Sequence, residues 1–313
     1  MMHATKVLIA DHSPATREVL EKMLSGWGYE PVLAADGAEA WEILHAEEGP
    51  RLAILDAHLT GIGATDLCRA MRAENRLSQP YLLLLAEKGP IEELVAGLDA
   101  GADDYITRPF HSMEFRARLE AGCRIVKLQD RLLCAHERLY EQATRDSLTG
   151  LWNRVAAMQI LEREIARATR SKTSVAVIMA DLDHFKEVND THGHLSGDAL
   201  LREAAARMSS SLRSYDSIGR YGGEEFLVVI PGCHFRDSLV VAERLREAVG
   251  GQPFRIGEST CRITCSFGLA WTACIDGADA NQLLREADSA LYAAKKNGRN
   301  RVEAMAPQLA VAG

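Results

Sequence analysis

The chain has 313 residues, of which 47% are hydrophobic and 26% are charged, and its formal net charge is −8. This length suggests about two domains, and the composition is that of a globular protein rather than a disordered or fibrous one. The negative charge argues against general affinity for nucleic acid. The chain has no run of about 18 apolar residues, so no membrane-spanning helix is expected.

The cysteines indicate the redox environment. Seven of them are scattered without the spacing of a metal site or a disulfide framework. An odd number, in a chain whose first residues lack the apolar core of a signal peptide, favours free thiols in a reducing cytoplasm. Cys261 and Cys265 are expected on one face of a single strand, where they would pack rather than react.

Apolar runs and helical patterns alternate over residues 1–120. The runs at 6–11, 52–56 and 81–85 predict buried strands, and helical patterns occupy 38–45, 65–72 and 91–100. Another helix is expected to begin at Ser13 and Pro14, an N-cap followed by proline. This alternation predicts a doubly wound α/β domain. Asp11 and Asp56 each end a strand, so they should meet at the carboxyl edge of a parallel sheet.

This first domain resembles the flavodoxin-like receiver domain of bacterial response regulators. The resemblance is carried by residues 7–11, 55–56 and 101–110. It implies that Asp56 is a phosphoacceptor for a histidine kinase and that Asp11 is a Mg²⁺ ligand. It also implies that Tyr105 is the switch aromatic and that Arg108 stands where the family has lysine.

The chain departs from the receiver pattern at three positions that matter for its chemistry. His12 replaces a second acid, and Mg²⁺ prefers oxygen ligands. Ala86 lacks the hydroxyl that would contact a phosphoryl group, and Arg108 keeps the charge of lysine without its compact ammonium. The domain is therefore expected to be partly degenerate. Two interpretations stay open: phosphorylation at Asp56, or a pseudo-receiver that acts mainly in dimerisation.

Residues 121–145 are expected to form a helical coiled-coil linker. Apolar residues recur at spacings of four and three, which is a heptad seam. They are Ala121, Ile125, Leu128, Leu132, Ala135 and Leu139. The simpler alternative is one amphipathic helix packed on its own domain. A dimer stalk is favoured because the seam continues past the receiver boundary.

A second domain is expected over residues 146–306, with a tail at 307–313. Helices are predicted at 154–170, from about 198 to 211, at 236–249 and at 280–296, and strands at 174–180, 216–221, 226–230 and 262–271. A polar loop is predicted at 189–198. The pair Gly222 and Gly223 is expected to form a two-residue hairpin turn, because both of its central positions favour positive φ.

Carboxylates from separate segments can meet in this domain. Asp181 ends a strand, and Glu224 and Glu225 follow the glycines at the hairpin tip. If the two strands are neighbours, Asp181 and Glu224 can hold a divalent cation, which nucleotidyl transfer needs in order to neutralise phosphate charge. By itself the hairpin could also be an ordinary surface turn.

The second domain resembles the GGDEF family of nucleotidyl cyclases, with the variant sequence Gly-Gly-Glu-Glu-Phe. The resemblance covers the whole domain and is carried by residues 146–154, 181–186, 189–198, 222–226 and 294–301. It implies an α+β fold and the condensation of two GTP into cyclic di-GMP and two pyrophosphates. It also implies a homodimer, because each domain holds one GTP, and a Mg²⁺ or Mn²⁺ cofactor.

The resemblance also assigns roles to residues. Metal ligands would be Asp181, the Leu182 carbonyl and Glu224, and Glu224 would also be the base for the ribose 3′-hydroxyl. The triphosphate and its developing charge would be held by Lys186, Lys295 and Arg299. The guanine would be bound by Asn189 and Asp198, beside His194 and Gly223. Asp183 is expected beside the metal site rather than in it.

A product-inhibition site is implied by Arg213 and Asp216, which match the family's Arg-x-x-Asp motif, with Arg244 as a further member. An ion pair at a helix end is the alternative. Two rival functions are also considered: a non-catalytic cyclic di-GMP receptor and a mixed cyclic GMP–AMP synthase. The acids and cations of the motifs argue against the receptor. Asp198, which suits guanine, argues against the mixed synthase.

Overall fold

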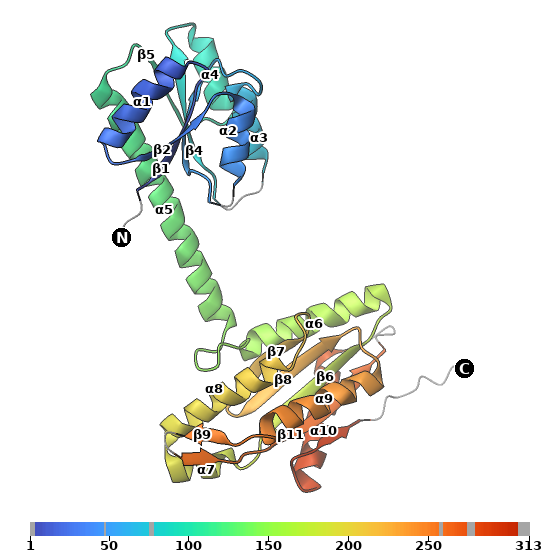
Figure 1. Cartoon of the computed structure of the whole chain (residues 1–313). Coiled ribbons are helices and arrows are strands. Elements are labelled where there is room, and N and C mark those ends of the chain that lie inside the picture. The colour runs from blue at the N-terminus through green and yellow to red at the C-terminus, as the bar shows by residue number, and fades with distance from the viewer. Residues whose placement is uncertain (1–3, 47, 75–77, 257–258, 274–278, 306–313) are drawn as a thin grey trace. The chain divides into compact units, whose positions relative to one another are not determined.

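The computed structural model describes residues 4–46, 48–74, 78–256, 259–273 and 279–305. The predicted tail at 307–313 lies outside these residues. The chain divides into two compact units, residues 1–137 and residues 138–313 (Figure 1). Within the described residues, no helix is both long enough and apolar enough to cross a membrane.

Among the described residues, the first unit contains a five-stranded parallel sheet in the order β2-β1-β3-β4-β5. Its strands are β1 (Lys6–Ala10), β2 (Glu30–Ala34), β3 (Leu52–Asp56), β4 (Tyr81–Glu87) and β5 (Asp104–Arg108). Its helices are α1 (Pro14–Gly26), α2 (Gly37–His45), α3 (Ala64–Ala73), α4 (Ile91–Asp99) and the first part of α5 (Ser112–Thr144). One face of the sheet is covered by α1 and α5, and the other by α2 and α3. This is the flavodoxin-like arrangement expected from the sequence.

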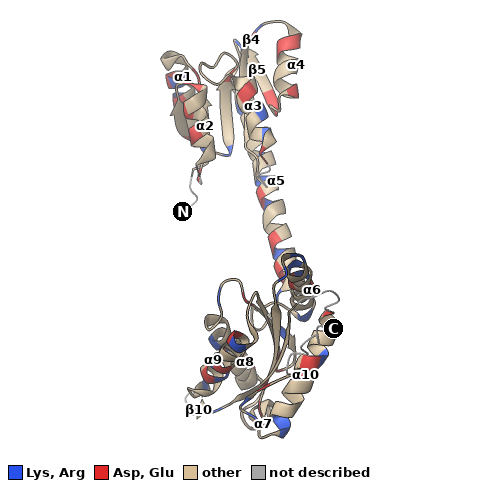
Figure 2. Cartoon of the chain, turned by 90° about the vertical axis from the view of Figure 1, so that its right-hand side faces the viewer, with Lys and Arg blue, Asp and Glu red and all other residues tan. Residues whose placement is uncertain are grey.

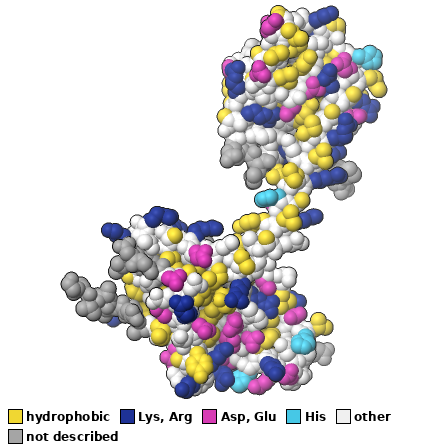
Figure 3. Space-filling model, turned by 180° about the vertical axis from the view of Figure 1, so that it is seen from behind, with side chains coloured by type: hydrophobic (Ala, Val, Ile, Leu, Met, Phe, Trp, Pro, Cys, Tyr) yellow, Lys and Arg dark blue, Asp and Glu magenta, His cyan; other side chains and the backbone are white. Residues whose placement is uncertain are grey.

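The helix α5 uses two different sets of apolar residues. Phe115, Leu119 and Val126 are buried in the core of the first unit. The seam residues Leu128 and Leu132 are instead 61% and 70% exposed. Ile125 and Leu139 are exposed too, and hydrophobic side chains are visible along this part of the helix (Figure 3). Charged residues of both signs also lie along α5 (Figure 2). The seam is therefore not what attaches the helix to the first unit.

Among the described residues, the second unit contains a five-stranded sheet in the order β12-β11-β6-β8-β7. Its strands are β6 (Val175–Leu182), β7 (Ser217–Gly222), β8 (Glu225–Pro231), β11 (Cys265–Thr272) and β12 (Val302–Ala304). The central strand β6 runs antiparallel to both β8 and β11 and is buried along its whole length. One face packs against α8 (His194–Ser210) and α9 (Phe235–Gly250), and the other against α6 (Arg154–Ser171) and α10 (Ala280–Lys296).

Two predicted elements of this unit were wrong. The predicted polar loop at 189–198 is a pair of helices, α7 (Phe185–His192) and α8, which break at Gly193 with a φ of 81°. Asp190, Thr191, His192 and His194 are exposed on these helices, whereas Asn189 and Asp198 are half-buried. Cys261 and Cys265 do not share a strand, because Cys261 ends β10 (Ser259–Cys261), which pairs with β9 (Phe254–Ile256), and Cys265 begins β11.

Candidate active site

The hairpin of β7 and β8 turns one residue later than the glycine pair predicted. Gly222 pairs with Glu225, and the register shifts between Arg220 and Gly222. The two turn residues are therefore Gly223 and Glu224, and of the two glycines Gly223 has a positive φ, 45°. The bulge at the end of β7 accounts for the difference, because it adds a residue to that strand before the turn. Glu224 lies at the tip, as expected.

The hairpin tip lies beside the end of β6. Asp181 pairs with Glu225 across the two strands. The Leu182 N–H donates to the Glu224 carbonyl oxygen at 3.4 Å, one residue beyond the ladder. The sheet order thus brings together the two chain segments that the sequence left as separate candidates. Asp181, Leu182 and Glu224 lie at one edge of the sheet.

This edge carries more negative than positive charge. Asp181 is buried, and its carboxylate pairs with Lys295 Nζ at 2.8 Å. Burial raises the pKa of Asp181 above its ordinary value, the charge on Glu224 adds to this rise, and Lys295 opposes it. Burial also raises the pKa of Glu225, with a further contribution from Asp181. An incompletely neutralised set of carboxylate oxygens is a donor set that fits a hard divalent cation.

Asp183 is held differently from Asp181. It is 3% exposed, and its carboxylate accepts hydrogen bonds from Thr264 Oγ1 at 2.6 Å and Ser266 Oγ at 2.7 Å. The backbone N–H of Asn300 is a third donor, at 3.1 Å. These three bonds use most of the acceptor capacity of the carboxylate, which is consistent with a place beside a metal site rather than in it.

The residues expected to bind a base come from α7 and α8. Asn189 packs directly against Gly197, where an added Cβ would lie 1.9 Å from Asn189 Oδ1. Asp198 is the next residue of α8, so this close packing brings Asn189 and Asp198 into one neighbourhood. His194 is exposed at the first residue of α8.

The three expected phosphate-binding cations lie in three places. Lys186 is exposed in the first turn of α7, shortly after β6 ends. Lys295 lies in the last turn of α10 and contacts Asp181 directly. Arg299 follows α10 in a left-handed conformation, with φ of 60°. The structure therefore joins Lys295 to the acidic edge, and it joins Arg299 indirectly, because the neighbouring Asn300 is bonded to Asp183.

The expected inhibitory residues lie between α8 and β7. The Arg213 N–H donates to Asp216 Oδ2 at 3.0 Å, and its guanidinium donates to the Tyr215 hydroxyl at 2.6 Å. The guanidinium thus bonds Tyr215, whereas Asp216 caps the Arg213 backbone. Arg244 is exposed on α9.

Sequence reasoning assigned no role to the pair Arg220 and Asp146. Arg220 Nε donates to the Gly223 carbonyl at 2.8 Å, and Nη1 lies 3.2 and 3.3 Å from the two Asp146 oxygens. Burial alone would raise the pKa of Asp146, but hydrogen bonds from Thr149 and the charge of Arg220 lower it. Arg220 thus links the hairpin turn to the segment that follows α5. The position of Arg220, two residues before the glycine pair, could have indicated from the sequence that it contacts the turn.

The receiver acids converge as predicted from the strand ends. Asp11, His12 and Asp56 offer ligand atoms that lie within 4.8 Å of one another. Arg108 Nη2 donates to Asp11 Oδ2 at 2.5 Å and lies 3.9 Å from Asp56 Oδ2. His12 Nδ1 lies 3.1 Å from Asp56 Oδ2. Both buried acids therefore already have basic neighbours.

Tyr105 is half-buried in β5, in the first unit. The guanidinium of Arg118 lies 6.0 Å from its ring centroid and also bonds Asp104 at 2.7 and 2.9 Å. Arg118 belongs to the first part of α5, so the ring that the resemblance identifies as the switch aromatic lies beside the part of α5 that precedes the linker residues.

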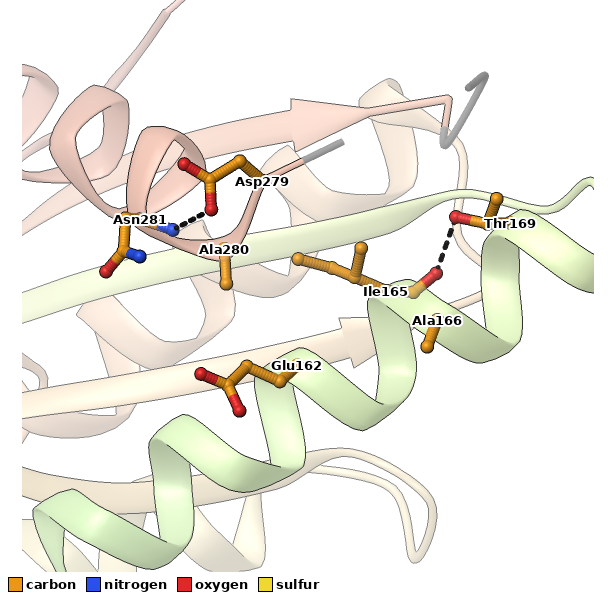
Figure 4. Close-up of a pocket in the computed structure, with 7 residues that line it drawn as sticks. All are labelled: Glu162, Ile165, Ala166, Thr169, Asp279, Ala280 and Asn281. Atoms are coloured by element: carbon orange, nitrogen blue, oxygen red, sulfur yellow. Dashed lines mark hydrogen bonds between the residues drawn. The ribbon is translucent and has the colours of Figure 1, made fainter. Parts of the chain in front are cut away.

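A pocket of about 490 Å³ lies between α6 and the start of α10 (Figure 4). It is lined by Glu162, Ile165, Ala166, Thr169, Asp279, Ala280 and Asn281. Lys295, which contacts Asp181, lies at the other end of α10. The pocket and the acidic edge are therefore separate features of the unit.

Comparison with known families and proteins agrees with both resemblances. Residues 143–301 match the family model "Diguanylate cyclase, GGDEF domain", and residues 7–120 match "Response regulator receiver domain". The chain is 34% identical over 299 residues to "Response regulator PleD" of Caulobacter vibrioides. This match covers 95% of this chain and 65% of the length of PleD. It is 36% identical over 219 residues to "Diguanylate cyclase DgcP" of Pseudomonas aeruginosa, covering 68% of this chain and 32% of DgcP.

Solved structures resemble the second part of the chain. The coiled coil and GGDEF domain of DgcB from Caulobacter crescentus, solved in complex with c-di-GMP, has a TM-score of 0.55 and 31% identity. It matches 62% of this chain and 100% of that chain. The diguanylate cyclase SiaD of Pseudomonas aeruginosa, solved with its activator SiaC, has a TM-score of 0.51 and 38% identity over 62% of this chain and 74% of that chain.

Proposed function

Because this chain belongs to the GGDEF diguanylate cyclase family and carries a receiver domain, we propose that it condenses two GTP into cyclic di-GMP and two pyrophosphates. One observation carries the proposal. The hairpin tip and the end of β6 meet, so that Glu224 adjoins Leu182 and Asp181. The pairing of Asp181 with Lys295 adds a phosphate-binding cation to the same edge.

We assign the metal-binding role to Asp181, the Leu182 carbonyl and Glu224, with Mg²⁺ or Mn²⁺ as the ion. A divalent ion held there would neutralise phosphate charge. Glu224 accepts the proton of the ribose 3′-hydroxyl. Lys295, which pairs with Asp181 at the same edge, would bind the triphosphate.

The remaining roles follow from position. Lys186 and Arg299 bind the triphosphate with Lys295 and stabilise charge that develops on it. Asn189 and Asp198 bind the guanine edge, and a carboxylate suits the N1–H and amino group that guanine presents. Gly223, which lacks a side chain, leaves room for the base beside His194.

The reaction requires two copies of the second domain, because each holds one GTP. We propose that residues 121–145 form a parallel dimer through the exposed seam of Ile125, Leu128 and Leu132, and that domain 146–306 is thereby aligned with its copy. Burying a leucine in such a seam stabilises the dimer by about 1.5–3 kcal/mol per side chain. The protein would act in the cytoplasm, where GTP is present.

We propose that the receiver acts mainly through dimerisation, because Arg108 and His12 already contact its acids. Phosphorylation of Asp56 by a histidine kinase is the alternative. We further propose that Arg213, Asp216 and Arg244 bind the product and slow turnover, with Arg213 leaving Tyr215 to stack on guanine.

The test is to incubate the purified full chain with GTP and Mg²⁺ and to identify the product by mass, with and without a phosphoryl donor. Cyclic di-GMP in both arms at equal rates supports the cyclase and the pseudo-receiver. A rate that rises with the donor supports phosphorylation of Asp56. Absence of product in both arms, with cyclic di-GMP bound, would favour the receptor. A mixed GMP–AMP product from GTP and ATP would favour the mixed synthase.

A further inference from the structure

The loop after α10 carries a proposed phosphate-binding residue in a strained conformation. Arg299 and Asn300 have φ angles of 60° and 47°, in the left-handed region that non-glycine residues rarely adopt. Two such residues in succession persist only where surrounding contacts hold them, and such strain is concentrated at functional sites. The contacts that hold Arg299 and Asn300 in this conformation are therefore relevant to the position of the Arg299 side chain.

The Arg299 N–H donates to the Ala294 carbonyl of α10 at 3.0 Å. Three further contacts fix the loop to other elements of the unit. The Asn300 N–H donates to Asp183 at 3.1 Å, and the Asn300 side chain accepts from Arg246 Nη1 of α9 at 2.9 Å. The Arg301 carbonyl accepts from the Phe267 N–H of β11 at 2.9 Å. Of these three, the bond to Asp183 acts on the backbone N–H of Asn300, the strained residue next to Arg299.

Asp183 is buried, and hydrogen bonds fix its carboxylate in place. A buried carboxylate is costly unless its oxygens are hydrogen-bonded. Thr264 and Ser266 each donate a hydroxyl to it, and Oδ2 also receives the Asn300 N–H. The two hydroxyls hold the carboxylate in one orientation, with Oδ2 directed at the loop.

We propose that Asp183 is a positioning residue that holds the Arg299–Asn300 backbone in place, so that Arg299 reaches the triphosphate of bound GTP. The proposal rests on the proposed GTP-condensing function. On this proposal, Asp181 and Asp183 each hold one of the cations that bind the triphosphate. Asp181 holds Lys295 through a direct ion pair, and Asp183 holds Arg299 through the neighbouring backbone.

The change in nucleotide affinity of the Asp183→Asn variant has opposite signs if Asp183 positions Arg299 and if Asp183 acts only through its charge. Asp183→Asn removes a negative charge close to a proposed triphosphate site, so charge alone would tighten nucleotide binding. An asparagine also keeps the size of the side chain but weakens its bond to the Asn300 N–H. If Asp183 positions Arg299, the variant binds the nucleotide more weakly in spite of the favourable charge change.

The experiment is calorimetric titration of the full chain with a non-hydrolysable GTP analogue and Mg²⁺. Arg299→Ala should weaken binding by about tenfold, the usual effect of losing a charge-assisted contact to phosphate. Asp183→Asn should weaken it by about three- to tenfold, and the double variant should be no weaker than Arg299→Ala alone. The matched control is Asp190→Asn, an exposed acid of α7, which should not weaken binding.

Each alternative outcome decides the matter. Equal or tighter binding by Asp183→Asn, or a loss that adds to that of Arg299→Ala, would overturn the proposal. If Asp183→Asn does not fold, Ser266→Ala removes one orienting hydroxyl and should give a smaller loss that is likewise absent in the Arg299→Ala background. A wild-type chain that binds the analogue but makes no product would remove the proposed function while leaving the role of Asp183 open to this same test. Failure of the wild-type chain to bind the analogue would overturn both.

Discussion

Strand-end carboxylates meet basic side chains in both units, and the two clusters differ in how well their charges balance. In the first unit, Asp11 and Asp56 are contacted by Arg108, with His12 beside Asp56. In the second unit, Lys295 faces the carboxylate of Asp181, with further acids on the adjoining hairpin.

The incomplete charge balance of the second unit is seen in the pKa values of its acids, Asp181 and Glu225. Burial raises the pKa values of Asp181 and Glu225, the charge of Glu224 adds to both rises, and the charge of Asp181 adds to the rise at Glu225. A divalent cation would relieve that repulsion. In the first unit the guanidinium of Arg108 already lies against both acids. Strand-end acids thus gather in both a parallel and an antiparallel sheet, and we propose that their basic neighbours make the second cluster depend more on a metal than the first.

The largest expected effect tests the second cluster. Glu224→Gln removes the proposed base and a metal ligand, so turnover of GTP should fall by about 10³-fold or more. The measurement is the initial rate of cyclic di-GMP formation. The control is Glu162→Gln, an exposed acid of the separate pocket on α6, which should keep the wild-type rate. Equal losses in both variants would contradict the assignment.

The next largest effect is expected from a charge placed in the linker, residues 121–145. Leu132→Glu places a charge in the exposed seam, so it should weaken dimerisation and lower specific activity by about tenfold at low protein concentration. The measurement is sedimentation equilibrium together with activity at several protein concentrations. Cys134→Glu adds the same charge to an exposed position off the seam and should leave both unchanged. A monomeric Leu132→Glu variant with full activity would remove the dimer requirement.

Competition between protons and the metal for Asp181 should make the metal requirement of the second cluster depend on pH. Because the pKa of Asp181 is raised, its proton competes with the metal, and metal affinity should fall by about tenfold for each pH unit below that pKa. The measurement is the Mg²⁺ concentration for half-maximal rate across neutral to acidic pH. A pH-independent metal requirement would mean that Asp181 is not a ligand.

The smallest expected effect concerns stability without metal. A pKa raised in the folded state means that the contribution of Asp181 to stability is present below its unfolded-state pKa and is lost as the pH rises through the folded value. At neutral pH, Asp181→Asn should therefore raise the melting temperature of the metal-free protein by about 2–4 °C, the shift that about 1 kcal/mol produces in a domain of this size. Added Mg²⁺ should stabilise the wild-type chain more than the variant. A lower melting temperature would show that the ion pair with Lys295 outweighs burial.

The sequence was informative where a pattern depended on local order. The apolar runs ending in Asp11 and Asp56 predicted strands whose ends converge, and the periodic residues of α10 predicted its bounds correctly. The edge strand β2, Glu30–Ala34, gave no such signal, because it is only partly buried and contains a proline.

The sequence was least informative where structure depends on contacts between distant segments. The glycine pair indicated a hairpin, but a bulge in β7 shifted its turn by one residue. The polar residues between Asn189 and Asp198 suggested a loop, although Gly193 alone interrupts two helices there. The bonds of Asp183 to Thr264 and Asn300 span 81 and 117 residues, and no local pattern could predict them.

The most direct test of the account is the Mg²⁺-dependent rate of cyclic di-GMP formation, without a phosphoryl donor, in three matched proteins: wild type, Asp56→Asn and Asp181→Asn. The two substitutions make the same chemical change at the end of a buried strand in each unit. The account predicts that Asp56→Asn keeps the wild-type metal dependence and rate, and that Asp181→Asn loses both. A wild-type rate in Asp181→Asn would contradict it.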